Sequence, residues 1–307
     1  MKLLFTCDLD PLGVTIDEER NKLNWFDFMD LYKFRKCFSK YSWKMNWFIR
    51  ADSFVEKFHN DIGWQYHNHI SIWDDFRKFG DGLAWHPHLY DQNGGSFELF
   101  KDSKSEAELL ETLFKKLKKI GINFEFVRVG EGRGSNHIIK TLAENGIKAD
   151  FSAIPGRYRK DENRNFDWLK TRNNLYYPSK KDYREQGDIN HQILEVPLTT
   201  TLVKADYDDE AKLRYLDLSY RNDIFKKSLE YLLDSENLSF LHFVCHPEGL
   251  ISDDFSNGLY DYGIKTLSSN LDVTHKLLND KKIEFESLNL EGFYNYFKND
   301  ETRNPVY

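Results

Sequence analysis

Two histidines flank a proline in the stretch GDGLAWHPHLY, residues 80–90. Pro87 biases His86 toward an extended conformation, and residues two apart on an extended chain point to the same side. His86 and His88 are therefore expected to converge on one point. Imidazoles that share a site with carboxylates suit Zn²⁺ or another late divalent cation, with a coordination position left for water. The spacing predicts a metal site.

An aspartate pair, Asp8 and Asp10, lies near the N-terminus in the sequence TCDLDP. On a strand both carboxylates would face one side, and a bound cation would relieve their mutual repulsion. Two other interpretations stay open. The pair is also typical of a turn at the end of a strand, because Asp before Pro is common in loops. An Asp-x-Asp pair can equally hold the divalent ion of a glycosyltransferase that uses a nucleotide sugar.

Two further candidates follow apolar runs. His246 comes just before Pro247 at the end of LSFLHFVC, and Arg128 lies near the end of NFEFVRVG. Imidazole titrates near neutral pH, so His246 is a candidate general acid, with a turn histidine as the alternative. His242 lies deeper in the same run and is predicted to be packed or hydrogen-bonded. The glycines of VGEGRGSN do not have the G-x-G-x-x-G spacing, so a dinucleotide site is not favoured.

The elements that must position these residues alternate between strand and helix. Apolar runs predict strands over residues 2–8, 45–52, 81–88, 123–130, 147–153, 192–200, 238–246 and 282–288. Helical spacing predicts helices over residues 69–80, 105–121, 136–146 and 223–235, and one more before the last strand. Ser105 and Glu108 match a capping box at the start of the second helix. This alternation indicates an α/β fold, a mainly parallel sheet with a barrel-like arrangement, whose chemistry gathers at the carboxyl ends of the strands.

Composition narrows the class of protein. The chain has 307 residues, which we interpret as one domain over residues 1–307, and a net charge of −7 without a basic stripe, so nucleic acid is not expected as a partner. Aromatic residues make up 16%; they suit sugar rings, although a coding bias explains them equally well. No apolar run is long enough for a membrane span, and the N-terminal run is too short for a signal peptide. Three cysteines without paired spacing fit a reducing compartment, so a cytoplasmic location is expected.

The order of these pieces resembles the NodB-type polysaccharide deacetylases, carbohydrate esterases that use a metal ion to remove acetyl groups from N-acetylated sugars. TCDLD resembles the element that carries the family's base and a metal-binding acid, and GLAWHPHLY the element that carries its metal histidines. The later elements follow in the same order and together span residues 1–250: VRVGEGRGSNHIIKTLAENGIKADFSAIPG, NLYYPSKKDYREQGDINHQILEVPLT and FVCHPEG. The resemblance implies a distorted, incomplete (β/α) barrel of about seven parallel strands, with this chain as a divergent member.

The chain departs from the family pattern in two places. Leu9 separates two aspartates that are adjacent in the family. The family's histidines are four residues apart, which puts Tyr90 at the second position. The second imidazole ligand is then either His88, or a position lost to tyrosine.

The resemblance implies a role for each candidate. The ion, zinc with iron or cobalt as alternatives, would bind Asp10, His86 and His88, polarise the substrate carbonyl and lower the pKa of water. Asp8 would take the proton of the attacking water. His246 would protonate the departing amine.

The remaining roles concern alignment and the substrate. Arg128 would keep Asp8 ionised and aligned. Tyr90 and the turn-rich segment 155–188, with Trp168 and Tyr177, would contact the sugar. The partner expected is therefore an N-acetylated saccharide, whose identity and linkage the sequence does not give, and the oligomeric state stays open. Two alternatives remain: a non-catalytic saccharide-binding protein on the same fold, and a glycosyltransferase that would not need the histidines.

Overall fold

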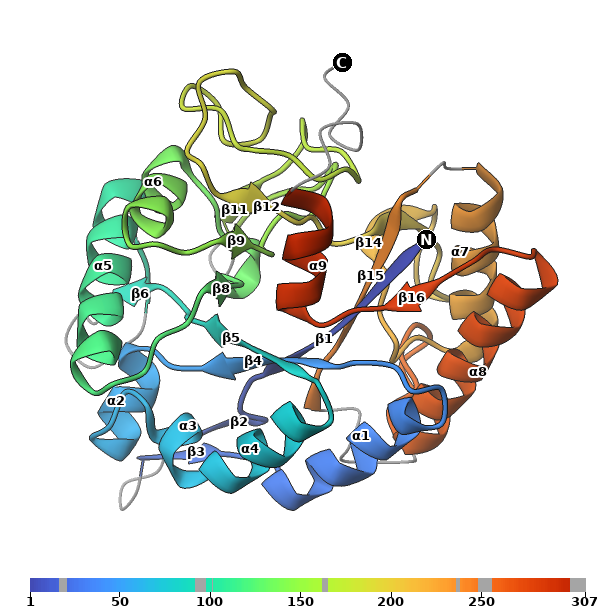
Figure 1. Cartoon of the computed structure of the whole chain (residues 1–307), viewed down its shortest axis with the longest axis horizontal. Helices are drawn as coiled ribbons and strands as arrows, with labels where there is room; N and C mark the ends of the chain where they lie inside the picture. Colours follow the sequence, from blue (N-terminus) through green and yellow to red (C-terminus); the bar gives the residue numbers. More distant parts are fainter. Residues whose placement is uncertain are drawn as a thin grey trace. The chain divides into compact units, whose positions relative to one another are not determined.

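The computed structural model describes residues 1–16, 21–91, 98–100, 102–161, 165–235, 238–247 and 256–298 (Figure 1). The chain divides into two compact units, each assembled from separate stretches. The first comprises Met1–Trp47, Ser71–Gly82 and Leu198–Phe293, and the second comprises Phe48–Ile70, Leu83–Pro197 and the chain from Tyr294 onward. The single domain expected over residues 1–307 stays a prediction.

The first unit is built on strand β1 (Lys2–Leu9), which pairs in parallel with β15 (Phe240–Cys245) and with β16 (Glu286–Ser287). All six residues of β15 are buried, as expected of a parallel strand that is covered on both faces. The register pairs Cys7 with Cys245. Asp8 and His246, which follow these two cysteines, therefore lie at the same end of the two strands.

Helices and two hairpins complete the first unit. Helix α7 packs on α8, which also contacts α1 (Figure 1). The amphipathic patterns of these helices place apolar residues such as Leu271 and Leu278 in the core. The elements are α1 (Leu31–Ser39), most of α4 (Ile70–Lys78), α7 (Asn222–Ser235), α8 (Ile264–Asp280), the start of α9 (Leu290–Lys298), and the hairpins β2–β3 (Gly13–Ile16, Asn21–Asn24) and β13–β14 (Thr200–Val203, Lys212–Tyr215).

The second unit contains a parallel series in the order β5 (Gly82–His86), β8 (Phe126–Val127), β9 (Ala149–Asp150) and β12 (Leu194–Glu195). Helices α5 and α6 pack against each other in this unit (Figure 1). Its other elements are α2 (Ser53–His59), α3 (Trp64–Asn68), α5 (Ser103–Lys119), α6 (Asn136–Glu144), the 3-10 turn η2 (Gly130–Gly132), and the hairpins β6–β7 (Tyr90–Asp91, Glu98–Leu99) and β10–β11 (Tyr158–Lys160, Asn165–Asp167).

Strand β4 (Asn46–Arg50) contributes its first two residues to the first unit and its last three to the second. With β4, the described residues hold seven main parallel strands, namely β1, β4, β5, β8, β9, β12 and β15. The predicted fold class, an α/β fold with a distorted and incomplete (β/α) barrel, is confirmed.

The start of helix α5 differs from the prediction. The helix begins at Ser103, and the Asp102 side chain caps it by accepting hydrogen bonds from the backbone N–H groups of Lys104 and Ser105. Ser105 lies inside the first turn, where its hydroxyl donates to Asp102. The predicted capping box is therefore wrong, because the extended Asp102, three residues before Ser105, already accepts the exposed N–H groups.

Several elements are shorter than predicted, and others were not predicted at all. β8 covers only Phe126–Val127 of the expected strand over residues 123–130, and β16 covers only two residues. The sequence patterns did not predict α1, α2, α3 or α9. Among the described residues no helix combines the length and the apolar character that crossing a bilayer requires.

Candidate active site

In the first unit, the carboxyl end of β1 carries the predicted aspartates. Asp8 is the next-to-last residue of the strand and is 6% exposed, whereas Asp10 follows the strand and is half-buried. The hydrophobic run before them fixes the strand in the core and so delivers both carboxylates to its end. Asp8 and Asp10 are therefore placed at a strand end as predicted.

His246 follows the last residue of β15 and lies between two carboxylates. Its Nε2 is 3.9 Å from Oδ2 of Asp8, and its Nδ1 is 3.9 Å from Oδ2 of Asp217. The imidazole is 28% exposed, while the two acids are almost fully buried. An accessible imidazole between two carboxylates can carry a proton and exchange it with a bound molecule.

Asp217 is a site residue that the sequence analysis missed. The chain after β14 runs beside β15: the N–H of Leu218 donates to Val244 O (2.9 Å) and the N–H of Val244 donates to Leu216 O (3.0 Å). The N–H of Ser219 donates to Oδ1 of Asp217 at 2.8 Å, which fixes the carboxylate. The available signal was an acid within the apolar stretch YLDLSY, because a buried acid requires a partner.

Two buried side chains below this group are structural. Nε2 of His242 lies 3.2 Å from the hydroxyl of Thr6, and the His242 N–H donates to Thr199 at 2.9 Å, so the predicted packed histidine is confirmed. Burial and the neighbouring Cys7 thiol raise the pKa of Cys245 well above its usual value. A thiolate nucleophile is therefore disfavoured here.

In the second unit, His86 ends β5 and is 2% exposed. Its Nδ1 lies 2.8 Å from the carbonyl oxygen of Arg128. Because a carbonyl can only accept, Nδ1 carries the proton, and the lone pair of the neutral ring is on Nε2. Nε2 of His88 lies 3.3 Å from this atom, and the two rings are perpendicular. The predicted convergence of the two histidines is thus present in the structure.

This histidine pair fits a metal ion. Two nitrogens that each lie about 2.0–2.1 Å from a tetrahedral zinc ion are roughly 3.3–3.4 Å apart, which the observed separation matches. The same distance allows a hydrogen bond between two neutral rings, so the donor set fits the ion without requiring it. A protonated Nδ1 held by a carbonyl is also the arrangement that orients metal-binding histidines.

The loop that carries the histidines is held at both ends. The N–H of Gly130 donates to Pro87 O at 2.8 Å, and the N–H of His88 donates to Oδ2 of Asp52 at 3.1 Å. Asp52 also caps helix α2 and pairs with Arg50 at 2.6 Å. This buried carboxylate therefore ties the loop to the start of a helix.

Arg128 follows β8 and is 4% exposed. Its Nε donates to Phe151 O at 3.0 Å, and its guanidinium lies 4.4 Å from the centre of the Phe48 ring. These contacts hold the residue at the strand end that the sequence predicts. Its role toward Asp8 stays a prediction.

Asp150 and Glu195 form a buried acid pair that the sequence analysis did not identify. They are register partners on β9 and β12 and are fully buried. Ser152 donates its N–H to Asp150 at 3.1 Å, and Ala153 donates its N–H to Glu195 at 3.0 Å. Burial raises the pKa of Asp150 to about 7 and that of Glu195 well above its usual range. A shared proton explains how two acids persist side by side.

The predicted substrate-binding residues have different environments. Trp168 is 0% exposed, its Nε1 donates to Gly132 O at 2.6 Å, and its ring packs on Tyr183. A ring buried on both faces cannot stack on a sugar, so this predicted role is wrong. Tyr177 is half-buried, and burial raises its pKa. Tyr90 donates its hydroxyl to Glu131.

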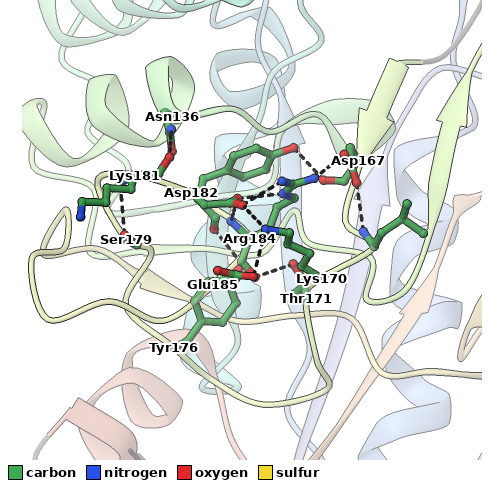
Figure 2. A network of polar contacts seen from close by, with 12 residues as sticks. Asn136, Asp167, Lys170, Thr171, Tyr176, Ser179, Lys181, Asp182, Arg184 and Glu185 are labelled. Atoms are coloured by element: carbon green, nitrogen blue, oxygen red, sulfur yellow. Dashed lines mark hydrogen bonds and ion pairs between the residues drawn. The ribbon is translucent and has the colours of Figure 1, made fainter. Parts of the chain in front are cut away.

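The segment 155–188 is irregular apart from one short hairpin, and a polar network holds its later part (Figure 2). Arg184 donates to Asp182 at 2.8 Å and also to Asp167, and Lys170 pairs with Asp182 at 3.0 Å and with Glu185 at 3.2 Å. Arg184 holds the pKa of Asp182 well below its usual value. Residues 162–164 of the predicted cap lie outside the described residues.

Comparison with known proteins supports the fold. No family model and no curated protein matches the chain. The crystal structure of a candidate polysaccharide deacetylase from Mycobacterium smegmatis matches with a TM-score of 0.51 and 13% identity, over 97% of this chain and 90% of that one. Weaker likenesses, both with a TM-score of 0.41, are the Xyl-CE4 domain of a multidomain xylanase from the hindgut metagenome of Trinervitermes trinervoides (12% identity, 100% and 94% covered) and the peptidoglycan deacetylase PdaC from Bacillus subtilis (9%, 96% and 90%).

At this level of identity the likeness to the mycobacterial structure shows the fold. The predicted resemblance to the NodB-type polysaccharide deacetylases is therefore confirmed for the architecture of the chain. The function of the chain depends on the residues of its own site, because one fold can carry many activities.

Proposed function

We propose that this chain is a metal-dependent hydrolase that removes the acetyl group from an N-acetylated saccharide. The observation that carries the proposal is the convergence of two imidazoles at the end of β5, with Nδ1 of His86 donating to a backbone carbonyl. The shared fold adds support, because the chain has the architecture of a candidate polysaccharide deacetylase.

In this proposal His86, His88 and Asp10 would hold the ion and would supply two imidazoles and one carboxylate as its ligands. This donor set suits zinc, with iron or cobalt as alternatives. The chemistry that a divalent cation supplies at such a site is polarisation of the acetyl carbonyl and a lower pKa for a water molecule. The other steps fall to side chains of this chain.

Asp8 accepts a proton from the water molecule as the water oxygen forms a bond with the acetyl carbon. Arg128 favours the ionised form of this base. His246 then gives a proton to the nitrogen as the C–N bond breaks, which releases acetate and a free amine. Asp217, which is 3.9 Å from the other nitrogen of His246, favours the protonated imidazole that this step needs. Tyr177 and Tyr90 remain the proposed contacts to the sugar.

The test begins with metal content. Elemental analysis of the purified protein should find about one divalent cation per chain, which His86→Ala should lose. Acetate release from N-acetylglucosamine oligomers should then depend on the metal, and a chelator should abolish it. If the protein stays without metal after incubation with zinc, the proposal of a metal-dependent hydrolase is wrong. Binding of the oligomers without acetate release would instead favour the saccharide-binding alternative.

If the two aspartates served a glycosyltransferase, the imidazoles would be dispensable. His86→Ala and His246→Ala would then leave the transfer of the sugar unchanged. If the wild type releases acetate and both variants lose this activity, the chain is a deacetylase and not a glycosyltransferase.

A further inference from the structure

Glu131 lies in the turn η2, directly beside the histidine pair. It adopts φ +61° and ψ 16°, which is the left-handed region that residues with side chains rarely occupy. The neighbouring Gly130 binds the histidine loop through its N–H and Pro87 O. An unusual backbone conformation therefore brings a carboxylate to this loop.

The carboxylate of Glu131 lies among three groups. One oxygen accepts the hydroxyl hydrogen of Tyr90 and is 3.9 Å from Nδ1 of His88. The other oxygen is 3.9 Å from Nε of the buried Arg133. Arg133 is itself paired with Glu106. The position of the carboxylate is thus set by a phenol and a guanidinium, and it faces the nitrogen of His88 that points away from His86.

Gly130, the residue before Glu131, lies directly against the imidazole of His88. A Cβ atom at Gly130 would lie 2.3–2.5 Å from three ring atoms of His88. These distances are far shorter than any real contact, so a side chain at this position would displace the ring. Two consecutive residues of one turn therefore accommodate His88.

The family pattern places a metal-binding histidine at position 90, but Tyr90 has a different role in this chain. Its hydroxyl donates to Glu131, whereas Nε2 of His88 faces Nε2 of His86. Tyr90 thus supports the carboxylate of Glu131, and the imidazole of His88 faces His86.

We propose that Glu131 is a positioning residue for His88, and that Tyr90 and Arg133 hold Glu131 in place. A carboxylate near Nδ1 favours the tautomer with its proton on that nitrogen, which leaves the lone pair on Nε2 for a metal ion. His86 obtains the same tautomer from the carbonyl of Arg128. The inference rests on the proposed metal site and assigns its second imidazole to position 88.

The test measures zinc affinity by competition with a chelator of known affinity. Glu131→Gln keeps the size of the side chain and removes the charge, and it should weaken zinc binding about 10- to 100-fold, as loss of a partner of a metal-bound histidine does. Tyr90→Phe should weaken binding by a smaller factor. Glu144→Gln, an exposed substitution in α6 of the same unit, is the matched control and should bind zinc like the wild type.

A double-mutant cycle separates positioning from a general structural effect. If Glu131 acts through His88, then Glu131→Gln should have no further effect on zinc affinity in a His88→Ala background. Gly130→Ala, which displaces the ring and leaves Glu131 intact, should weaken binding as well. Thermal unfolding of the metal-free proteins checks that each variant is folded.

The outcomes are distinguishable. A wild type that binds zinc while Glu131→Gln binds it equally well would overturn the positioning role alone. Equal losses from Glu131→Gln with and without His88 would also overturn it. A wild type that binds no zinc would overturn the proposed metal site, and this inference with it.

Discussion

The two units hold their candidate residues in different ways. In the first unit, His246 is 28% exposed, and its two ring nitrogens each lie 3.9 Å from a carboxylate oxygen. In the second unit, His86 is 2% exposed and has a 2.8 Å contact to a backbone carbonyl, and the backbone of His88 is held by a buried aspartate. The imidazole of the first unit is partly exposed, and the His86 imidazole of the second unit is buried against a backbone carbonyl.

This difference matches two kinds of chemistry. A group that gives up a proton must reach its reaction partner and exchange protons afterwards, so some exposure is useful. A metal ligand must keep its lone pair in one direction, so rigid support is useful. We therefore interpret the first unit as the source of proton transfer and the second as the source of imidazole ligands. The substitutions below test this division.

The largest expected effect is the loss of the base. Asp8→Asn keeps the shape of the side chain but cannot accept the proton, so kcat for acetate release should fall about 10²- to 10⁴-fold. Because the proposal makes Asp8 the base and leaves the carboxylate ligand to Asp10, the variant should retain its metal. Steady-state kinetics and elemental analysis of the same preparation measure both quantities.

His86→Ala provides the contrast, because it should lose the ion and the activity together. An Asp8→Asn protein that has also lost its metal would contradict the role of Asp8 as a base that does not bind the ion. Circular dichroism of both variants excludes unfolding as the cause.

The strand ends could be predicted from the sequence because the physical signal is local. Buried parallel strands read as apolar runs, and the first polar residue after a run marks its exit from the core. In the structure Asp8 and His86 lie within the last two positions of their strands, and Arg128 and His246 directly follow theirs. The convergence of His86 and His88 was also local, because Pro87 fixes the extended backbone between them.

The residues that the sequence did not reveal depend on contacts between distant segments. Asp217 reaches His246 only because the chain after β14 runs along β15, and Glu131 reaches His88 only through a turn with positive φ. The converse error concerns Trp168, where an aromatic residue in a turn-rich segment proved to be buried. Composition indicates that aromatic residues are available to bind a sugar, but packing decides which aromatic rings have an exposed face.

The buried acid pair of the second unit, Asp150 and Glu195, should make the free energy of unfolding depend on pH. Asp150 is protonated in the folded state up to its pKa of about 7, whereas the unfolded chain ionises it near the ordinary aspartate pKa of 3.8. The folded state therefore binds more protons between these values, so the free energy of unfolding should fall as pH rises from about 4 to about 7. Asp150→Asn removes this titration, so the fall in the free energy of unfolding should become smaller. Urea unfolding at pH 5, 6, 7 and 8 measures it.

Asp74→Asn is the control for this measurement, because it removes an exposed carboxylate from α4 in the first unit. Its unfolding free energy should follow the wild type at every pH. Identical pH profiles for Asp150→Asn and the wild type would contradict the shared proton of Asp150 and Glu195.

The smallest expected effect concerns the support of the general acid. Asp217→Asn keeps the hydrogen bond from Ser219 but removes the charge beside Nδ1 of His246, so kcat should fall roughly tenfold, less than for loss of an acid or base. Zinc affinity should stay constant, because Asp217 is not among the proposed ligands. Steady-state kinetics and chelator competition on the same preparation measure both quantities. An unchanged kcat would mean that proton donation in the first unit does not depend on Asp217, and the half-buried imidazole alone would then suffice.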